Sequence, residues 1–326
     1  MGRHAKTVIS SDGFDRRRTG YYSTPKPIAN YLFENMTSLL PQGKKVLDPC
    51  VGKEELIEAF VKKGFDTNSF DIHRYKSEYL SNFREIDFLR FYLDHKTAVE
   101  DLNLDYDFYI ANPPYNCHED DYIKSHKLAL EKNFQSIGTL NMYSMFLYSI
   151  LDLAKEGAII GLITMDSFLT SFYHFRLRKY ILENFSIHHL LLCPTDLFAD
   201  QDADVRTCIL ILQKGIQYQK KVILNNRDAN QKIFFEKIGQ NSFKEADVNE
   251  IILQDPKDHF EIVVDVPEEI RSLFKYKRLG ELFPASQEFP QATILSTYPK
   301  IDRKHSTFLS IKIRETENSI RILTVS

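Results

Sequence analysis

Residues 142–164 read MYSMFLYSILDLAKEGAIIGLIT, and this stretch decides the fold class. Its first part, 142–155, predicts a strongly apolar helix, and its last part, 158–164, an uninterrupted apolar strand. Strands that are apolar on both sides are typical of parallel sheets covered by helices on both faces. The stretch therefore predicts one unit of an α/β domain.

The same alternation extends along the chain in both directions. Strands are expected over 44–48, 67–72, 107–111, 187–193 and 205–213, and helices over 54–63 and 174–183. No helix separates the last two strands, which favours an antiparallel pair at the end of the sheet. The predicted fold is α/β and Rossmann-like, with a doubly wound, mostly parallel sheet and an antiparallel terminal strand pair. Such sheets bind ligands beyond the carboxyl ends of their strands.

Composition places the chain among ordinary globular proteins. It has 326 residues, 43% hydrophobic and 27% charged, enough for one large domain and a smaller one. No apolar run reaches the roughly 18 residues of a membrane helix, and the N-terminus has no apolar stretch of signal-peptide type. Cys50, Cys117, Cys193 and Cys208 form no C-x-x-C pair. We therefore expect free thiols, no zinc site and a cytoplasmic location.

The net charge of −3 lacks the basic excess of many nucleic-acid-binding proteins. Contacts with phosphates would have to come from local clusters, of which Arg16–Arg18 and the group Arg176, Arg178 and Lys179 are candidates. Solvated surface charge is the favoured interpretation of either cluster taken alone. Charge thus neither proves nor excludes DNA as a partner.

Polar residues stand at the ends of the predicted strands. Asp48 ends the first strand, and Gly52 follows where backbone could approach a ligand closely. Asp71 ends the next strand, 23 residues later (71 − 48), a spacing typical of an acid that binds ribose hydroxyls. Asp87 ends a third segment, and Asn112 follows the strand at 107–111. Each acid alone could be a helix cap or turn residue. Together, in order at one sheet edge, they predict a binding site.

Three motifs carry a resemblance to a known family. N-P-P-Y (112–115), D-P-x-x-G (48–52) and T-G-Y-Y-S-T-P (19–25) resemble the gamma-class N6-adenine DNA methyltransferases of restriction–modification systems. N-P-P-Y alone is shared with methyltransferases that act on glutamine or RNA, and the N-terminal motif narrows the choice. The resemblance covers about residues 15–285 and implies a class I methyltransferase fold.

The same resemblance implies a function and its partners. We expect a site-specific, adenine-specific DNA methyltransferase that uses S-adenosyl-L-methionine, binds double-stranded DNA and is monomeric. A partner restriction endonuclease is compatible with this expectation. Two alternatives stay open: an N-P-P-Y methyltransferase acting on RNA or protein glutamine, and an inactive cofactor-binding remnant.

The resemblance also implies which residues hold the cofactor. They are Thr19, Tyr22, Thr24, Pro25, Asp48, Pro49, Gly52, Asp71, Asp87, Phe88 and Asn112. The N-terminal segment would fold over the cofactor, Asp48 and Gly52 would line its methionine part, and Asp71 would accept its ribose hydroxyls. Asp87 would accept the amino group of its adenine, and Phe88 would pack on that ring. One residue departs from the family: Glu54 stands where similar proteins carry a second glycine, and its side chain is expected to crowd the cofactor.

The N-P-P-Y residues, Asn112, Pro113, Pro114 and Tyr115, are the predicted catalytic group. The amino nitrogen of adenine is a poor nucleophile because its lone pair is delocalised into the ring. Two acceptors, the Asn112 side-chain oxygen and the Pro113 carbonyl, would localise that lone pair. The two prolines keep the turn rigid, and an amide avoids a buried unpaired charge. Positioning would then supply most of the acceleration.

An adenine inside a duplex must be flipped out to reach such a site. Tyr115 is expected to stack on one face of the base, an interaction worth about 1–3 kcal/mol. The resemblance assigns the other face to Phe198, although this chain has 24 phenylalanines and most belong to the core. The run from His118 to Asp121 is interpreted as a solvated helix start, and no metal is expected.

Residues 278–287 resemble the start of a DNA target recognition domain. We therefore expect a catalytic domain over 1–277 and a truncated recognition domain over 278–326. Codons for Glu288–Leu295 read one nucleotide earlier give, for permitted wobble choices, the family's G-x-x-T-G-x-N stretch, so a frameshift near residue 288 is our hypothesis. The DNA recognition sequence would depend on the missing part, and it is not predicted.

Overall fold

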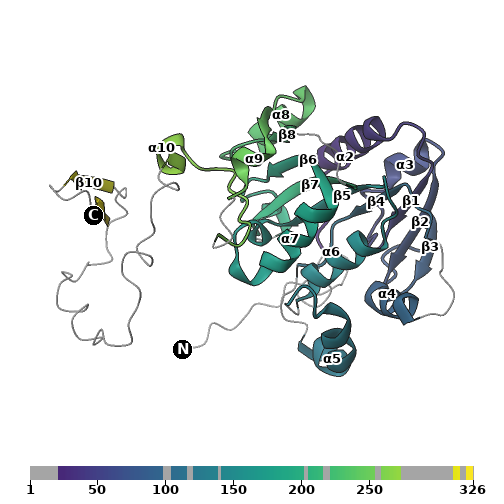
Figure 1. Cartoon of the computed structure of the whole chain (residues 1–326). Helices are drawn as coiled ribbons and strands as arrows, with labels where there is room; N and C mark the ends of the chain where they lie inside the picture. Colours follow the sequence, from purple (N-terminus) through teal and green to yellow (C-terminus); the bar gives the residue numbers. More distant parts are fainter. Residues whose placement is uncertain are drawn as a thin grey trace, which may run out of the picture. The chain divides into compact units, whose positions relative to one another are not determined.

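In the computed structural model, placements are described for residues 21–97, 104–115, 120–138, 141–201, 205–215, 221–253, 258–272, 311–315 and 321–325. The chain divides into two compact units, Met1–Pro267 and Glu268–Ser326. The first unit holds the α/β domain drawn in Figure 1. The second contains α10 (Glu268–Arg271) and an antiparallel pair, β10 (Ile311–Glu315) and β11 (Arg321–Val325).

The first unit is built on a nine-stranded sheet with the order β3-β2-β1-β4-β5-β7-β6-β8-β9. The strands are β1 (Lys45–Asp48), β2 (Asp66–Asp71), β3 (Asn82–Glu85), β4 (Phe108–Ala111), β5 (Ile159–Met165), β6 (Phe185–Leu192), β7 (Thr207–Lys214), β8 (Lys221–Leu224) and β9 (Lys244–Asp247). The first five in the sheet order are parallel to one another. Strand β7 lies antiparallel between β5 and β6.

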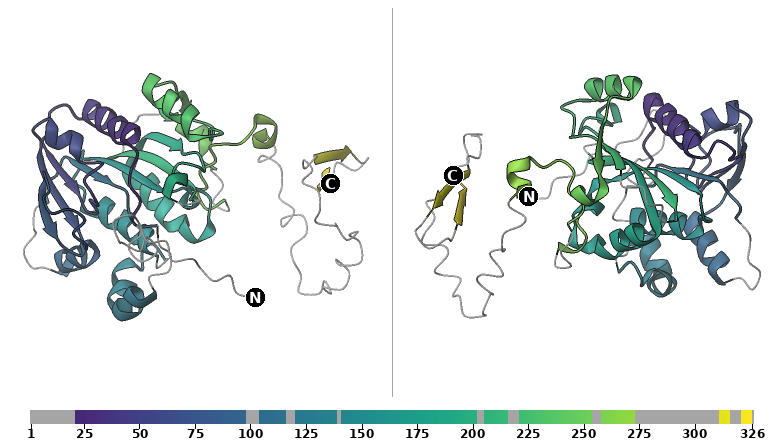
Figure 2. Two further views of the ribbon diagram at one scale, coloured as in Figure 1. Left: turned by 180° about the vertical axis from the view of Figure 1, so that it is seen from behind. Right: turned by 45° about the horizontal axis from the view of Figure 1, so that its top comes forward.

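Helices cover both faces of this sheet (Figures 1 and 2). On one face lie α2 (Lys26–Leu39), α3 (Glu58–Lys62) and α8 (Gln231–Gln240). On the other lie α4 (Phe88–Thr97), α5 (Asp120–Phe134), α6 (Met142–Leu153) and α7 (Phe175–Asn184). Short helical turns complete the unit: η1 (Asp166–Leu169), η2 (Phe172–His174), η3 (Ala199–Gln201) and α9 (Val248–Ile251).

The central strands are buried on both sides because their side chains alternate between two cores. In β4, Phe108 and Ile110 join the core under α2, whereas Tyr109 and Ala111 join the core under α6. All four side chains are fully buried. The predicted doubly wound α/β architecture is therefore confirmed.

Two details differ from the sequence-based expectation. The helix expected over 54–63 is confined to α3, because residues 51–57 form turns in which Gly52 and Glu54 have positive φ. The β6–β7 pair is antiparallel as predicted, but it does not end the sheet. Strands β8 and β9 extend the sheet beyond β6.

Arg178 was expected either to contact phosphate or to be solvated, and it does neither. Its side chain is fully buried and donates hydrogen bonds to the carbonyl oxygens of Phe168, Ser171, His259 and Phe260. It therefore fastens the end of the first unit, around residue 260, to the segment that follows β5.

Several expectations lie outside the described residues and stay predictions. They concern Thr19, the cluster Arg16–Arg18, His118 and Glu119, the domain boundary at 277/278 and the proposed frameshift near 288. Asp120 and Asp121, from the same run as His118, are the first residues of α5, as expected of a helix start. In the described ranges, Cys50, Cys193 and Cys208 carry free thiols. No helix in those ranges has both the length and the apolar character needed to cross a membrane.

Candidate active site

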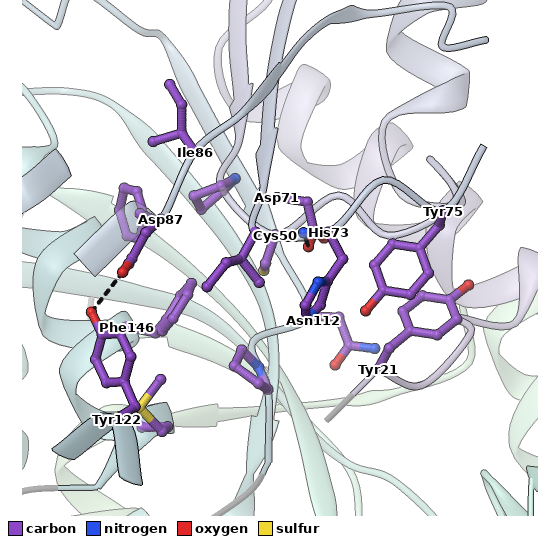
Figure 3. Close-up of a pocket in the computed structure, with 15 residues that line it drawn as sticks. Tyr21, Cys50, Asp71, His73, Tyr75, Ile86, Asp87, Asn112, Tyr122 and Phe146 are labelled. Carbon is purple, nitrogen blue, oxygen red and sulfur yellow. Dashed lines mark hydrogen bonds between the residues drawn. The ribbon is translucent and has the colours of Figure 1, made fainter. Parts of the chain in front are cut away.

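The parallel strands bring the ends of β1, β2 and β4 to one edge of the sheet, and a cavity opens there (Figure 3). It holds about 810 Å³ of space free of protein atoms, including its mouth. Its lining comprises Tyr21, Pro49, Cys50, Asp71, Ile72, His73, Tyr75, Ile86, Asp87, Phe88, Asn112, Pro114, Tyr122, Met142 and Phe146.

Six of the predicted site residues line this cavity: Pro49, Asp71, Asp87, Phe88, Asn112 and Pro114. Asp71 joins two of its walls, because its carboxylate accepts hydrogen bonds from the backbone N–H groups of Gly52 (2.9 Å) and His73 (3.0 Å). Burial raises the pKa of Asp71, and these two N–H groups offset part of that rise. The loop after β1 and the segment after β2 are thus held together at the cavity.

Asp48 lies buried beneath the loop that follows β1. One of its carboxylate oxygens accepts from the backbone N–H of Cys50 (3.1 Å), and the other has no hydrogen-bond partner among the described residues. Burial raises its pKa well above the ordinary value, and the charges of Asp71 and Glu55 add to the effect. A buried acceptor without a partner is rare in folded proteins and is a candidate ligand contact.

Asp87 and Phe88 form the opposite wall of the cavity. The carboxylate of Asp87 accepts from the hydroxyl of Tyr122 (2.9 Å), the bond drawn in Figure 3, and from the backbone N–H of Arg90 (3.2 Å). Phe88 is buried, and its ring centroid lies 5.3 Å from that of Phe146. A carboxylate edge and an aromatic face therefore stand next to each other.

The Asn112 side chain has a chemically fixed orientation. Its amide nitrogen donates to the backbone carbonyl of Tyr22 (3.0 Å) and to the hydroxyl oxygen of Thr24 (3.1 Å). A carbonyl can only accept, so the nitrogen must face Tyr22 and the amide oxygen must face away. That oxygen accepts a hydrogen bond from the hydroxyl of Tyr115. The N-terminal segment thus aims the amide.

The two residues predicted to stack on a base are close together, but their rings are covered. Tyr115 and Phe198 have ring centroids 6.2 Å apart and planes tilted by 57°. Both are buried. The ring of Tyr22 lies 5.4 Å from Tyr115, stacked on it, and 5.6 Å from Phe198. Tyr22 therefore belongs to this aromatic cluster, and its ring is not part of the cavity lining.

The other predicted residues support the cavity without lining it. Gly52 has φ +54°, and a Cβ there would lie 2.3 Å from the ring of Tyr21. Pro25 is the N-cap of α2, and its carbonyl accepts from the N–H of Ile28 (3.0 Å). Pro113 is buried in the turn.

Sequence reasoning missed several lining residues. Tyr21 stands within the quoted T-G-Y-Y-S-T-P motif, so the motif could have indicated it. Its ring stacks on that of Tyr75 at 4.8 Å beside Asn112 (Figure 3). Tyr75, His73 and Tyr122 lie in segments without any recognisable motif, and only the fold brings them to the site.

The strand order, the antiparallel β7 and a cavity at the carboxyl edge define a class I methyltransferase fold. Solved structures of restriction–modification proteins share it. One of a type I restriction–modification system has a TM-score of 0.55 at 16% identity, covering 86% of this chain and 63% of that chain. A type I methyltransferase subunit from Streptococcus thermophilus has a TM-score of 0.51 at 14% identity, covering 74% and 58%.

Sequence comparisons point to a particular kind of methyltransferase. Residues 51–198 match the sequence model of the Eco57I restriction-modification methylase family. The type II methyltransferase M.BsuBI of Bacillus subtilis is 26% identical over 246 residues, which cover 66% of this chain and 48% of that protein. M.AccI of Acinetobacter calcoaceticus is 25% identical over 219 residues, which cover 65% and 39%.

The chain therefore spans about half the length of M.BsuBI and less of M.AccI. The matches support the predicted restriction–modification methyltransferase with S-adenosylmethionine as its cofactor.

Proposed function

We propose that this chain transfers a methyl group from S-adenosylmethionine to the N6 nitrogen of an adenine flipped out of double-stranded DNA, as gamma-class enzymes do. The observation that carries the proposal is the fixed Asn112 amide beside the cavity. Its nitrogen is satisfied by Tyr22 and Thr24, so its oxygen is the group presented to a substrate. An amide oxygen is an acceptor suited to an amino group.

The residues around the cavity fit the cofactor. Asp71 lines the cavity and can accept from ribose hydroxyls. Asp48 is buried and is not part of the lining, and its partnerless oxygen is the acceptor that we assign to the ammonium group of the methionine part. Asp87 and Phe88 offer an acceptor and a ring face for the adenine part. The three carboxylates favour a ligand that carries positive charge on sulfur and nitrogen.

When bound, S-adenosylmethionine supplies a methyl group made electrophilic by its positively charged sulfur. The protein's part is to hold and sharpen the nucleophile. The Asn112 oxygen and the Pro113 carbonyl would accept the two N–H bonds of the adenine amino group, which concentrates its lone pair on nitrogen. Pro113 and Pro114 fix φ near −65°, so the turn does not yield when these bonds form.

Tyr115 acts on the target base in two ways in this proposal. Its ring, on which Tyr22 is stacked in this structure, would supply a stacking face once Tyr22 is displaced, with Phe198 at the other side of the base. Its hydroxyl donates to the Asn112 oxygen and so stands where the amino group of adenine would bind. A tyrosine hydroxyl is protonated at neutral pH, and burial raises the pKa of Tyr115 further above its ordinary value, so the group is a donor here. An entering base would replace it.

DNA as the partner is supported by the kinds of protein that share the fold. One of them is a DrdV–DNA complex, with a TM-score of 0.55 at 16% identity over 75% of this chain and 31% of that chain. We also propose that the protein acts as a monomer and that a separate restriction endonuclease is its partner.

The test is methyl transfer from radiolabelled S-adenosylmethionine to bacterial genomic DNA, followed by mapping of the modified bases. We expect label on adenine N6. Asn112→Ala should reduce transfer by roughly 10²–10³-fold, the range for loss of one group that stabilises a transition state. Cofactor affinity, measured by calorimetry, should change little. Asn133→Ala on α5 is the matched control, because within the described residues the Asn133 side chain bonds only to its own helix, at the carbonyl of Ala129.

Other outcomes would redirect the proposal. Label on RNA or on protein glutamine but not on DNA would favour the corresponding N-P-P-Y methyltransferase. Binding of the cofactor with no transfer to any of these substrates would favour a cofactor-binding remnant. Equal loss of binding and transfer in Asn112→Ala would contradict the role given to Asn112.

A further inference from the structure

Glu54 has a backbone conformation that favours glycine. It lies in the loop between β1 and α3 with φ +74°, two residues after Gly52 at +54°. Side chains are disfavoured in this left-handed region. The conformation agrees with the sequence resemblance, in which glycine is the usual residue here. A strained backbone persists only where surrounding contacts hold it.

Beside its backbone hydrogen bonds to Val51 and Glu58, Glu54 is held by contacts of its carboxylate. The side chain is 2% exposed, and its oxygens accept from the backbone N–H groups of Leu80 (3.0 Å) and Ser81 (2.8 Å). They also accept from the Ser81 hydroxyl (2.7 Å), and they form an ion pair with Lys76. Burial alone would raise the pKa of Glu54, but the bonds from Lys76, Ser81 and Leu80 lower it below its ordinary value. The group is therefore held as a carboxylate.

Glu54 is not part of the cavity lining, and its carboxylate bonds to Leu80, Ser81 and Lys76. Its partners lie in residues 72–81, which connect β2 to β3 and begin with Ile72, His73 and Tyr75 of the cavity wall. The Tyr79 hydroxyl adds a second link, since it donates to the carbonyl of Gly52 (3.2 Å).

We propose that Glu54 is a positioning residue for the cofactor. Its carboxylate clamps residues 72–81 onto the glycine loop and so sets the wall that faces the adenosyl part of the ligand. At the position where similar proteins carry a glycine, this chain thus has a side chain that supports one wall of the site without lining the cavity. This inference rests on the proposed function, because it assumes that the cavity holds S-adenosylmethionine.

The substitution Glu54→Gly distinguishes the effect of the carboxylate contacts from the effect of the backbone conformation. Glycine suits φ +74° better than glutamate does, so the backbone gains while the clamp is lost. We expect the dissociation constant for S-adenosylmethionine, measured by calorimetry, to rise about tenfold or more, because four bonds to a charged group disappear. In methyl transfer, KM for the cofactor should rise likewise, and kcat at saturating cofactor should stay within about twofold.

Hydrogen exchange in the ligand-free protein gives a second readout. The amides of Leu80 and Ser81 donate to Glu54, so Glu54→Gly should speed their exchange by about tenfold or more. Lys76→Met weakens the same clamp from its outer side and should give a smaller rise in the dissociation constant. Glu58→Ala on α3 is the control, because in the described part of the chain the Glu58 side chain pairs only with the exposed Lys62.

Cofactor affinity that is unchanged or tighter in Glu54→Gly would overturn the inference, since the residue would then be a tolerated departure. Should that variant fail to fold, unchanged affinity in Lys76→Met would overturn it equally. If the unaltered protein itself fails to bind S-adenosylmethionine, the proposed function falls and this inference falls with it. The two failures are therefore distinguishable.

Discussion

At the scale of single residues, the orientation of Asn112 depends on a part of the chain far from it in sequence. Tyr22 and Thr24 lie about 90 residues before Asn112 and hold its amide nitrogen. The Tyr22 contact is made by a backbone carbonyl, which no substitution of that residue removes. The Thr24 contact is made by a hydroxyl and can be tested.

Thr24→Val replaces that hydroxyl with a methyl group of similar size. The amide nitrogen keeps only one of its two acceptors, so the aim of the Asn112 oxygen loosens. We expect kcat for methyl transfer to fall about 5–10-fold, the equivalent of one hydrogen bond of about 1 kcal/mol. Thr24→Ser should restore most of the rate. An unchanged kcat in Thr24→Val would contradict the aiming role.

At the scale of elements, the approach of α2 to the sheet requires a glycine. A Cβ on Gly161 in β5 would lie 2.3 Å from the sulfur of Met36 and 3.2 Å from a methyl carbon of Leu32. Both side chains are fully buried in α2. The helix can therefore cross β5 at this distance only because position 161 carries no side chain.

Two glycine substitutions should have opposite effects on stability. Gly161→Ala overpacks the α2–β5 contact, and we expect the free energy of unfolding to fall by about 1–3 kcal/mol. Gly239→Ala in α8 meets no described atom within 4 Å and should raise it by about 0.5–1 kcal/mol, as expected for glycine in a helix. Urea denaturation measures both. Equal effects of the two changes would refute the close-packing argument.

Buried strands could be predicted from the sequence, whereas exposed edge strands could not. Strands β4 and β5 are continuous apolar runs, and β1 (K-V-L-D) has a buried apolar centre. The sequence predicts all three to within two residues. The edge strands β3 (N-F-R-E) and β9 (K-E-A-D) are largely exposed and carry no such pattern. Their pairing comes from tertiary contacts that local sequence does not encode.

The site follows the same rule. Asp71, Asp87 and Asn112 stand at strand ends, where the sheet topology alone predicts that ligand contacts gather. Tyr122 reaches Asp87 from α5, 35 residues further on, and nothing in its own segment indicates that contact. The role of Glu54 could not be predicted from the sequence either, because its partners lie in the loop 72–81, whose path the sequence does not specify.

At the scale of the whole molecule, two buried histidines link stability to pH. His174 bonds to the hydroxyl of Tyr143 and His189 to that of Tyr31, and burial foremost lowers the pKa of each to about 4. Unfolding restores values near 6.5, so the unfolded chain binds more protons between these limits. Their stabilising contribution is full above about pH 6.5 and is lost as the pH falls towards 4.

Each histidine should therefore cost about 1 kcal/mol of unfolding free energy between neutral pH and about pH 5.5. The measurement is urea denaturation at both pH values for the unaltered protein, His174→Gln and His189→Gln. Each variant should lose part of the pH dependence, whatever its stability at neutral pH. A pH dependence that is identical in all three proteins would show that these histidines are not its source.

The carboxylate oxygen of Asp48 that has no hydrogen-bond partner among the described residues links ligand binding to the pH of the solution. Without a cation beside it, this buried acid holds its proton to higher pH than an ordinary carboxyl does. An ammonium group placed against it favours the ionised form. A ligand that brings its ammonium group against Asp48 would then expel a proton into the buffer, and its uptake would become tighter with rising pH for as long as that ammonium group stays protonated.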